Sequence, residues 1–160
     1  MGEKFSKDFN IVNEYRKISE FPIVEPSYFQ VNLEMECFMS VNVIRHNPKA
    51  FKGHFEHIID FKDGYKGKHA KKFLKWLEKL EPLQPLAIDT DVMAACVTYN
   101  AQLKSETNES NIPRNGASQI FRSMVGTTQS TDVESFTYTA TWNHSAHELM
   151  LLNILLDFDR

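Results

Sequence analysis

The sequence predicts an α+β fold, in which a single domain has an antiparallel sheet with helices packed on one face. Two stretches, residues 29–43 and 133–142, alternate apolar and polar side chains, which is the pattern of strands with one wet face. Several other segments repeat apolar residues at helical spacing, most clearly residues 68–80. A chain of 160 residues with 42% hydrophobic residues is typical of one globular domain.

The elements of the first third follow from these patterns. Residues 6–19 are expected to form a helix that Ser6 caps, with Val12 and Tyr15 on its apolar stripe. Prolines then interrupt the chain. Residues 28–61 are expected to form strands, because the apolar side chains recur at every second position through most of this stretch.

The remaining elements are more mixed. Residues 68–80 and 90–103 are predicted helices, and 104–116 is predicted to be an exposed polar loop. The alternation in 133–142 predicts a strand. Residues 146–157 fit either a buried helix or a central strand. The pattern Ser145-Ala146-His147-Glu148 is that of a capping box and favours the helix.

Charge and cysteine content exclude some classes of function. The net charge of −3 gives no overall field that would attract nucleic acid or an anionic membrane. No apolar run approaches the roughly 18 residues that cross a bilayer, and the first residues lack the apolar core of a signal peptide. Cys37 and Cys96 lie far apart and are expected to be buried, reduced thiols. We therefore expect a cytoplasmic protein that has no contact with membranes.

A cluster of lysines is the first candidate site. Residues 62–79 carry seven lysines and no arginine, and the helix predicted over 68–80 places lysines opposite its apolar face. Such a face is solvated in most proteins, but it can also contact an acidic protein or phosphates. The absence of arginine argues against nucleic acid. The candidate binding residues are Lys68, Lys72, Lys75 and Lys79, with Arg114 of the predicted loop.

Two His-x-x-His motifs form the second candidate site. Histidines three positions apart can share a metal only where the segment is helical. His54 and His57 fall in a predicted strand and fail this test. His144 and His147 stand at a predicted helix start, where Glu148 could add an oxygen ligand. Such a ligand set would suit zinc, but ordinary surface histidines near a turn are the simpler explanation of the pattern.

A weaker pattern that is typical of enzymes lies at the end of one of the predicted strands. Asp60 and Lys62 form an Asp-x-Lys motif that a metal-dependent nuclease could use. The motif is short and frequent by chance. Nucleophile elbows and glycine-rich phosphate loops are absent from the sequence.

These observations favour a non-catalytic protein that acts by binding another macromolecule, most simply a protein partner. Small immunity or inhibitor proteins and dedicated chaperones have this size and composition. The first alternative is a metal-dependent hydrolase or nuclease that uses the His-x-x-His or Asp-x-Lys residues. The second is nucleic-acid binding through the lysine-rich helix 68–79. Replacing Lys72 and Lys75 with Glu is expected to slow association with an acidic partner.

Overall fold

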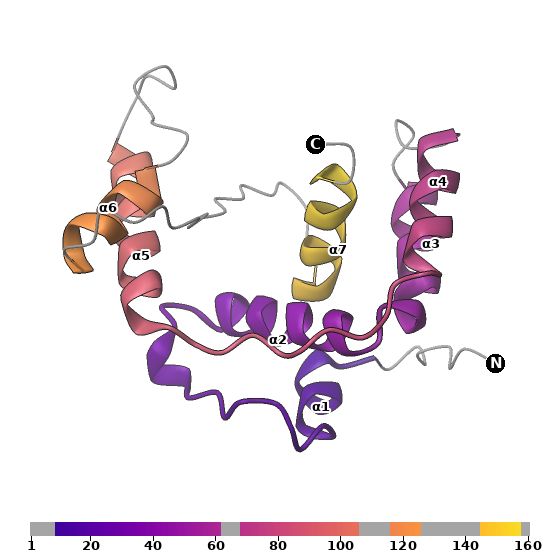
Figure 1. The fold of residues 1–160 in the computed structure, drawn as a ribbon, viewed down its shortest axis with the longest axis horizontal. Helices are drawn as coiled ribbons and strands as arrows, with labels where there is room; N and C mark the ends of the chain where they lie inside the picture. Colours follow the sequence, from indigo (N-terminus) through magenta and orange to yellow (C-terminus); the bar gives the residue numbers. More distant parts are fainter. Residues whose placement is uncertain (1–8, 62–67, 106–115, 126–144, 158–160) are drawn as a thin grey trace. The chain divides into compact units, whose positions relative to one another are not determined.

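The computed structural model describes residues 9–61, 68–105, 116–125 and 145–157, and it contains helices but no strand within these ranges. The predicted α+β class with an antiparallel sheet is therefore wrong. The described α-helices (Figure 1) are α1 (Ile11–Arg16), α2 (Asn32–His46), α3 (Lys52–Phe61), α4 (Lys68–Leu77), α5 (Thr90–Ser105), α6 (Gly116–Val125) and α7 (Ala146–Asp157). Two 3-10 helices, η1 (Pro26–Tyr28) and η2 (Pro48–Phe51), precede α2 and α3.

Helix α2 replaces the strand predicted over residues 29–43, and the reason lies in the spacing. An apolar residue at every second position also gives an apolar residue at every fourth position, which is close to one helical turn. Met35, Met39 and Val43 form such a stripe, and Met39 and Val43 are buried. The carboxylate of Glu34 accepts hydrogen bonds from the backbone N–H of Gln30 at 2.8 Å and of Val31 at 3.4 Å, which stabilises the helix start.

The second predicted strand, around residues 54–61, is also helical. Phe51 and Phe55 are fully buried and lie four residues apart, so they share one side of the helical segment formed by η2 and α3. The strand prediction for 28–61 is thus wrong throughout α2 and α3. The strand predicted over 133–142 lies outside the described residues, as does most of the loop predicted over 104–116.

The helix starts agree better with the sequence. Asp89 caps α5, because its Oδ1 accepts from the N–H groups of Asp91 and Val92 at 3.0 Å. At the predicted capping box the carboxylate of Glu148 accepts from the N–H of Ser145 at 2.9 Å, and residues 146–157 are the helix α7. The first helix is shorter than expected, since α1 begins at Ile11 and its cap is Asn10, whose Oδ1 accepts from Asn13 N–H.

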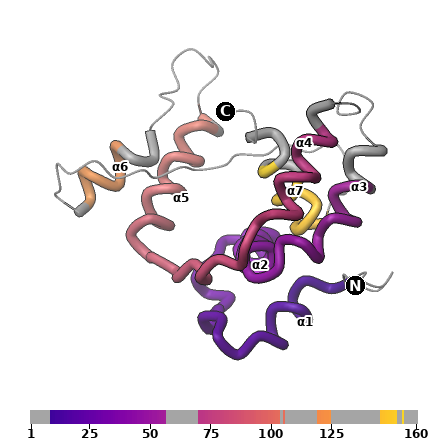
Figure 2. Tube along the Cα trace, turned by 45° about the vertical axis from the view of Figure 1, so that its right-hand side comes forward, coloured from indigo at the N-terminus to yellow at the C-terminus, as the bar shows by residue number. Residues whose placement is uncertain are grey.

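The structure divides into two compact units, Met1–Leu86 with Trp142–Arg160, and Ala87–Thr141. In the first unit, α1 and α7 both pack on α2, while α3 contacts α7 and α4 (Figures 1 and 2). Its core consists of Ile11, Tyr15, Phe21, Met39, Val43, Ile44, Phe51, Phe55, Ala70, Phe73, Leu77 and Leu151. The prediction of one domain for the whole chain stays a prediction.

The second unit contains the pair α5 and α6, which pack against each other. Tyr99 is its buried centre, with Val92, Cys96 and Leu103 along α5 and residues from α6 around it. The positions 92, 96, 99 and 103 are separated by three or four residues, as the sequence predicted for a helix here. In the described part of the chain, no helix combines the length and the apolar content that a bilayer span requires.

The segment that follows α4 is tied to α2. The side chain of Asn42 is fully buried, donates to the carbonyl of Leu86 at 3.3 Å and accepts from its N–H at 2.6 Å. The guanidinium of Arg45 donates through Nε and Nη2 to the carbonyl of Gln84 at 3.1 and 3.0 Å. These bonds satisfy backbone groups that have no helical partner, and they fix the chain as it leaves α4.

Candidate functional site

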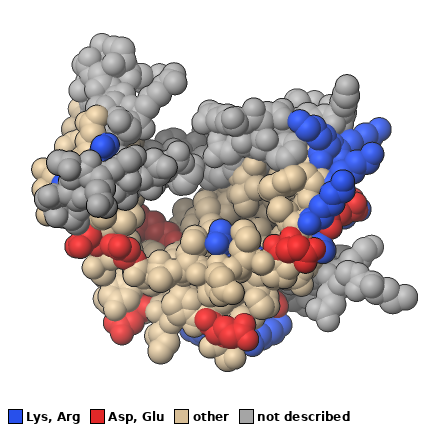
Figure 3. Space-filling view, in the orientation of Figure 1, with Lys and Arg blue, Asp and Glu red and all other residues tan. Residues whose placement is uncertain are grey.

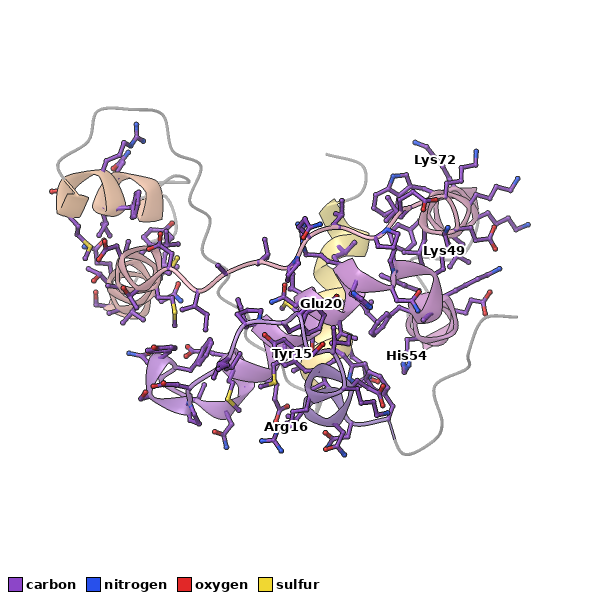
Figure 4. All side chains as sticks on the ribbon, turned by 60° about the horizontal axis from the view of Figure 1, so that its bottom comes forward. Tyr15, Arg16, Glu20, Lys49, His54 and Lys72 are labelled. Carbon is purple, nitrogen blue, oxygen red and sulfur yellow. The ribbon has the colours of Figure 1, made fainter. Side chains whose placement is uncertain are left out.

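Helix α4 has a buried side and a lysine side. Ala70, Phe73 and Leu77 are buried in the core of the first unit. Helical spacing therefore turns the positions between them outward, and the exposed lysines of this region are Lys71, Lys72, Lys75 and Lys79. We call these four residues the lysine face. Lys and Arg atoms gather over α4 in the space-filling view (Figure 3), and Lys72 points outward in Figure 4.

Carboxylates close to the lysine face are paired with lysines of other elements. Glu78 forms an ion pair with Lys52 of α3, and Glu81 forms one with Lys49 of η2 at 3.3 Å. The hydrogen bond from Lys52, helped by its charge, holds the pKa of Glu78 below its usual range. Within the described residues, Lys71, Lys75 and Lys79 have no carboxylate within ion-pair distance. The charge of Lys75 is a smaller cause of the lowered pKa of Glu78.

An aromatic side chain accompanies the lysine face. Helical spacing groups Trp76 with Phe73 and Leu77 on the apolar side of α4, yet Trp76 is 38% exposed. Its ring stands beside that of Phe73, with 5.6 Å between the centroids, so one end of it packs on the core. A half-exposed tryptophan of this kind is a common anchor in binding surfaces. The sequence signal for it was its place at the edge of the apolar stripe.

Two other predicted binding residues cannot be placed with the lysine face. Arg114 lies outside the described residues. Lys68 is the first residue of α4, but its side chain lies outside them as well. The face as described thus contains Lys72, Lys75 and Lys79 of the predicted set, and it adds Lys71.

One histidine from each His-x-x-His motif contacts the other in the first unit. His54 of α3 and His147 of α7 stand edge to face, with ring centroids 5.1 Å apart. Phe9 packs on both imidazoles at 4.8 and 4.6 Å, and Phe51 lies 5.6 Å from His54. We call these four residues the histidine cluster. Sequence reasoning missed it, because it considered each motif only within its own segment.

The cluster changes the chemistry of His147. Burial, with the nearby His54 as a second cause, lowers the pKa of His147 to about 4. The imidazole of His147 is therefore neutral at pH 7. Its Nε2 lies 3.4 Å from the hydroxyl oxygen of Ser145, the residue that caps α7.

The start of α7 does not support the predicted metal-ligand set of His144, His147 and Glu148. The carboxylate of Glu148 accepts hydrogen bonds from the N–H and the hydroxyl of Ser145, each at 2.9 Å, so it serves the capping box. His144 lies outside the described residues. Over the ranges that the structure describes, no three His, Cys, Asp or Glu side chains are grouped closely enough to hold a metal ion.

The Asp-x-Lys pattern does not lie at the end of a strand, as the sequence had predicted. Asp60 is in α3, its side chain lies outside the described residues, and so does Lys62. The thiols of Cys37 and Cys96 are half-buried. Burial raises the pKa of Cys37 to about 11, with Glu36 and Glu34 as further causes, and burial also raises the pKa of Cys96. Neither thiol is activated as a nucleophile.

Comparison with known proteins does not indicate a function for this chain. The chain matches no family model, no curated protein and no solved structure. Any functional conclusion therefore depends on the surfaces and clusters described above.

Proposed function

We propose that this protein is a non-catalytic binding protein and that the lysine face of α4 docks an acidic protein partner. The observation that carries the proposal is the group of exposed lysines on one side of α4, three of which have no carboxylate within ion-pair distance in the described residues. Lysines that are not neutralised locally are available to an external anion.

The surrounding charges support this choice. The chain carries a net charge of −3, so an acidic partner is repelled by the molecule as a whole. Within a distance of about 8 Å at physiological salt, however, the local charge dominates. The pairing of Glu78 and Glu81 with lysines outside the face keeps that local charge positive.

Trp76 supplies the apolar contact that a charged surface lacks. Charged groups at the rim of an interface mainly raise the association rate and the specificity, while aromatic anchors provide much of the affinity. Trp76 lies one position after Lys75 and is partly exposed. A partner with acidic residues around an apolar pocket would match this surface. The cytoplasm, which keeps thiols such as Cys37 and Cys96 reduced, suits such a protein.

The test uses immobilised poly-glutamate as an acidic polypeptide probe and duplex DNA as the competing polyanion. The purified chain is eluted from each matrix with a salt gradient. The test variant is Lys72→Glu with Lys75→Glu. The control is Arg16→Glu with Lys17→Glu, which makes the same charge change at two exposed residues at the end of α1.

We expect the wild-type chain and the control to be retained on poly-glutamate and the test variant to elute early. Equal retention of all three proteins would contradict a role for the lysine face. Stronger retention on DNA than on poly-glutamate would favour the nucleic-acid alternative over the protein partner.

A further inference from the structure

We propose that the acidic partner of the lysine face is a second copy of this chain, which docks through its residues 20–36. We call these residues the acidic segment. This inference rests on the proposed function, because it names the partner of the same lysine face. It is carried by the acidic segment, which combines glutamates with exposed apolar side chains.

The acidic segment is complementary to the lysine face in charge. It contains no lysine, arginine, histidine or aspartate, and its charged side chains are Glu20, Glu25, Glu34 and Glu36. Within the described residues, none of these carboxylates lies within ion-pair distance of a basic side chain. Their charges therefore add up locally, and they attract a cationic surface over about 8 Å at physiological salt.

The same segment exposes large apolar side chains, each at least 40% exposed: Ile23, Tyr28, Val31 and Leu33. In the part of the chain that the structure describes, no other stretch of this length exposes as many. Apolar groups exposed together and edged by charged groups are typical of protein-binding surfaces. On the lysine face, Trp76 is the half-exposed side chain that such a surface would receive.

Hydrogen bonds order the backbone of the acidic segment. The hydroxyl of Tyr15 donates to the carbonyl of Pro22 at 2.8 Å, which ties the segment to α1. The N–H of Tyr28 donates to the carbonyl of Glu25 at 3.0 Å within the turn of η1. A surface that is ordered before binding loses less conformational freedom when a partner docks on it.

The acidic segment and the lysine face are held at opposite ends of α2 (Figures 1 and 2). The segment includes the first residues of α2, whereas Arg45 in its last turn binds Gln84 of the chain that leaves α4. Leu33 and Arg45 are about 18 Å apart along the axis of this helix. A chain therefore cannot cover its own lysine face with its own acidic segment, so the contact forms head to tail between copies.

The experiment is sedimentation velocity of the untagged full chain over a series of protein concentrations at low salt. The lysine variant is Lys72→Glu with Lys75→Glu. The segment variant is Glu25→Gln with Val31→Ser, which removes one carboxylate and one exposed apolar side chain. These two variants are also mixed in equal amounts, because the mixture keeps one intact lysine face and one intact acidic segment.

The matched control is Glu56→Gln with Met124→Ser, which makes the same kind of change at two exposed residues outside both surfaces. Circular dichroism checks that each variant keeps its helices. If the segment variant loses its helices, Glu20→Gln with Glu25→Gln takes its place.

We expect the wild-type chain and the control to sediment faster as the concentration rises. Each single variant should associate at least tenfold more weakly, and the mixture should form a one-to-one dimer. A monomeric wild-type chain at every concentration would overturn the inference, as would a segment variant that associates like the wild type or a mixture that stays monomeric. Retention of a monomeric chain on poly-glutamate would overturn this inference alone and leave the proposed function standing.

Discussion

The lysine face and the histidine cluster belong to the same unit, but they present their polar groups in opposite ways. The lysine face holds its charges in water, and nearby carboxylates are paired with lysines from other elements. The histidine cluster holds its imidazoles between phenylalanine rings, where burial keeps His147 neutral. The first arrangement suits long-range attraction of a partner, and the second suits a short-range bond to a single proton.

The difference also shows what each region contributes to stability. The side chains of the lysine face are exposed, so their loss should leave the fold unchanged. The histidine cluster lies between α3 and α7, so its changes should alter both packing and pH dependence. The following predictions test this contrast, from the largest expected effect to the smallest.

The largest effect on stability is expected on the buried side of α4, opposite the lysine face. Phe73 is fully buried on the opposite side of α4, and its ring packs against Phe55 with 4.6 Å between centroids. Phe73→Ala should lower the free energy of unfolding by about 3–5 kcal/mol through lost burial and a cavity. Urea denaturation followed by circular dichroism measures this change. A loss similar to that of a surface lysine variant would mean that α4 is not packed as described.

The pH dependence should be carried by the histidine cluster. The pKa of His147 is lowered to about 4 in the folded chain, while an unfolded histidine has a pKa near 6.5. The unfolded state therefore binds more protons between these values, and this contribution to stability is lost as the pH falls from about 6.5 to about 4. After allowance for solvent screening we expect a loss of about 1–2 kcal/mol.

Urea denaturation at several pH values in this window, for the wild-type chain and for His147→Phe, isolates the effect from that of the carboxylates. The variant should lose less stability on acidification. Parallel curves for the two proteins would show that His147 is not held neutral by its surroundings.

The start of α7 should contribute a smaller amount. Ser145→Ala removes the hydroxyl that links the capping box to His147. We expect a loss of about 1 kcal/mol in the free energy of unfolding, the usual net contribution of one hydrogen bond, here the one from the Ser145 hydroxyl to Glu148. Thermal denaturation is the measurement, and Ser105→Ala, at the end of α5, is the control because it is not a cap. An unchanged midpoint for Ser145→Ala would show that the hydrogen bond from this hydroxyl to Glu148 does not stabilise the start of α7.

The smallest effect on stability is expected at the lysine face. Lys72→Ala and Lys75→Ala should each change the free energy of unfolding by less than about 0.5 kcal/mol, because both side chains are exposed. The same denaturation measurements serve here. A large loss in either variant would show that these lysines support the fold.

Local patterns in the sequence predicted part of this structure. The two faces of α4, the stripe on α5 and the bond from Ser145 N–H to Glu148 in the capping box each depend on residues within a few positions, and each was confirmed. The error over residues 28–61 arose because alternation also contains the four-residue spacing of a helix. Leu33 and Val31, which the alternation counted as inward-facing, are exposed in the structure.

The histidine cluster could not be predicted in the same way. Its two imidazoles are far apart in the sequence, and the contact depends on how α3 and α7 pack. The assignment of a strand to residues 54–57 removed His54 from consideration. The exposure of Trp76 was not predicted either, because helical spacing groups it with the buried residues Phe73 and Leu77, whereas its side chain stands at the boundary between the buried and exposed sides of α4.

The central claim is that binding depends on the lysine face and not on the histidine cluster. Fluorescence anisotropy with labelled poly-glutamate, at one low salt concentration, tests it directly when Lys72→Glu with Lys75→Glu is compared with His147→Phe. The account predicts an affinity about tenfold weaker for the charge-reversed chain and unchanged for His147→Phe. Equal affinities of the charge-reversed and wild-type chains, or a loss confined to His147→Phe, would contradict it.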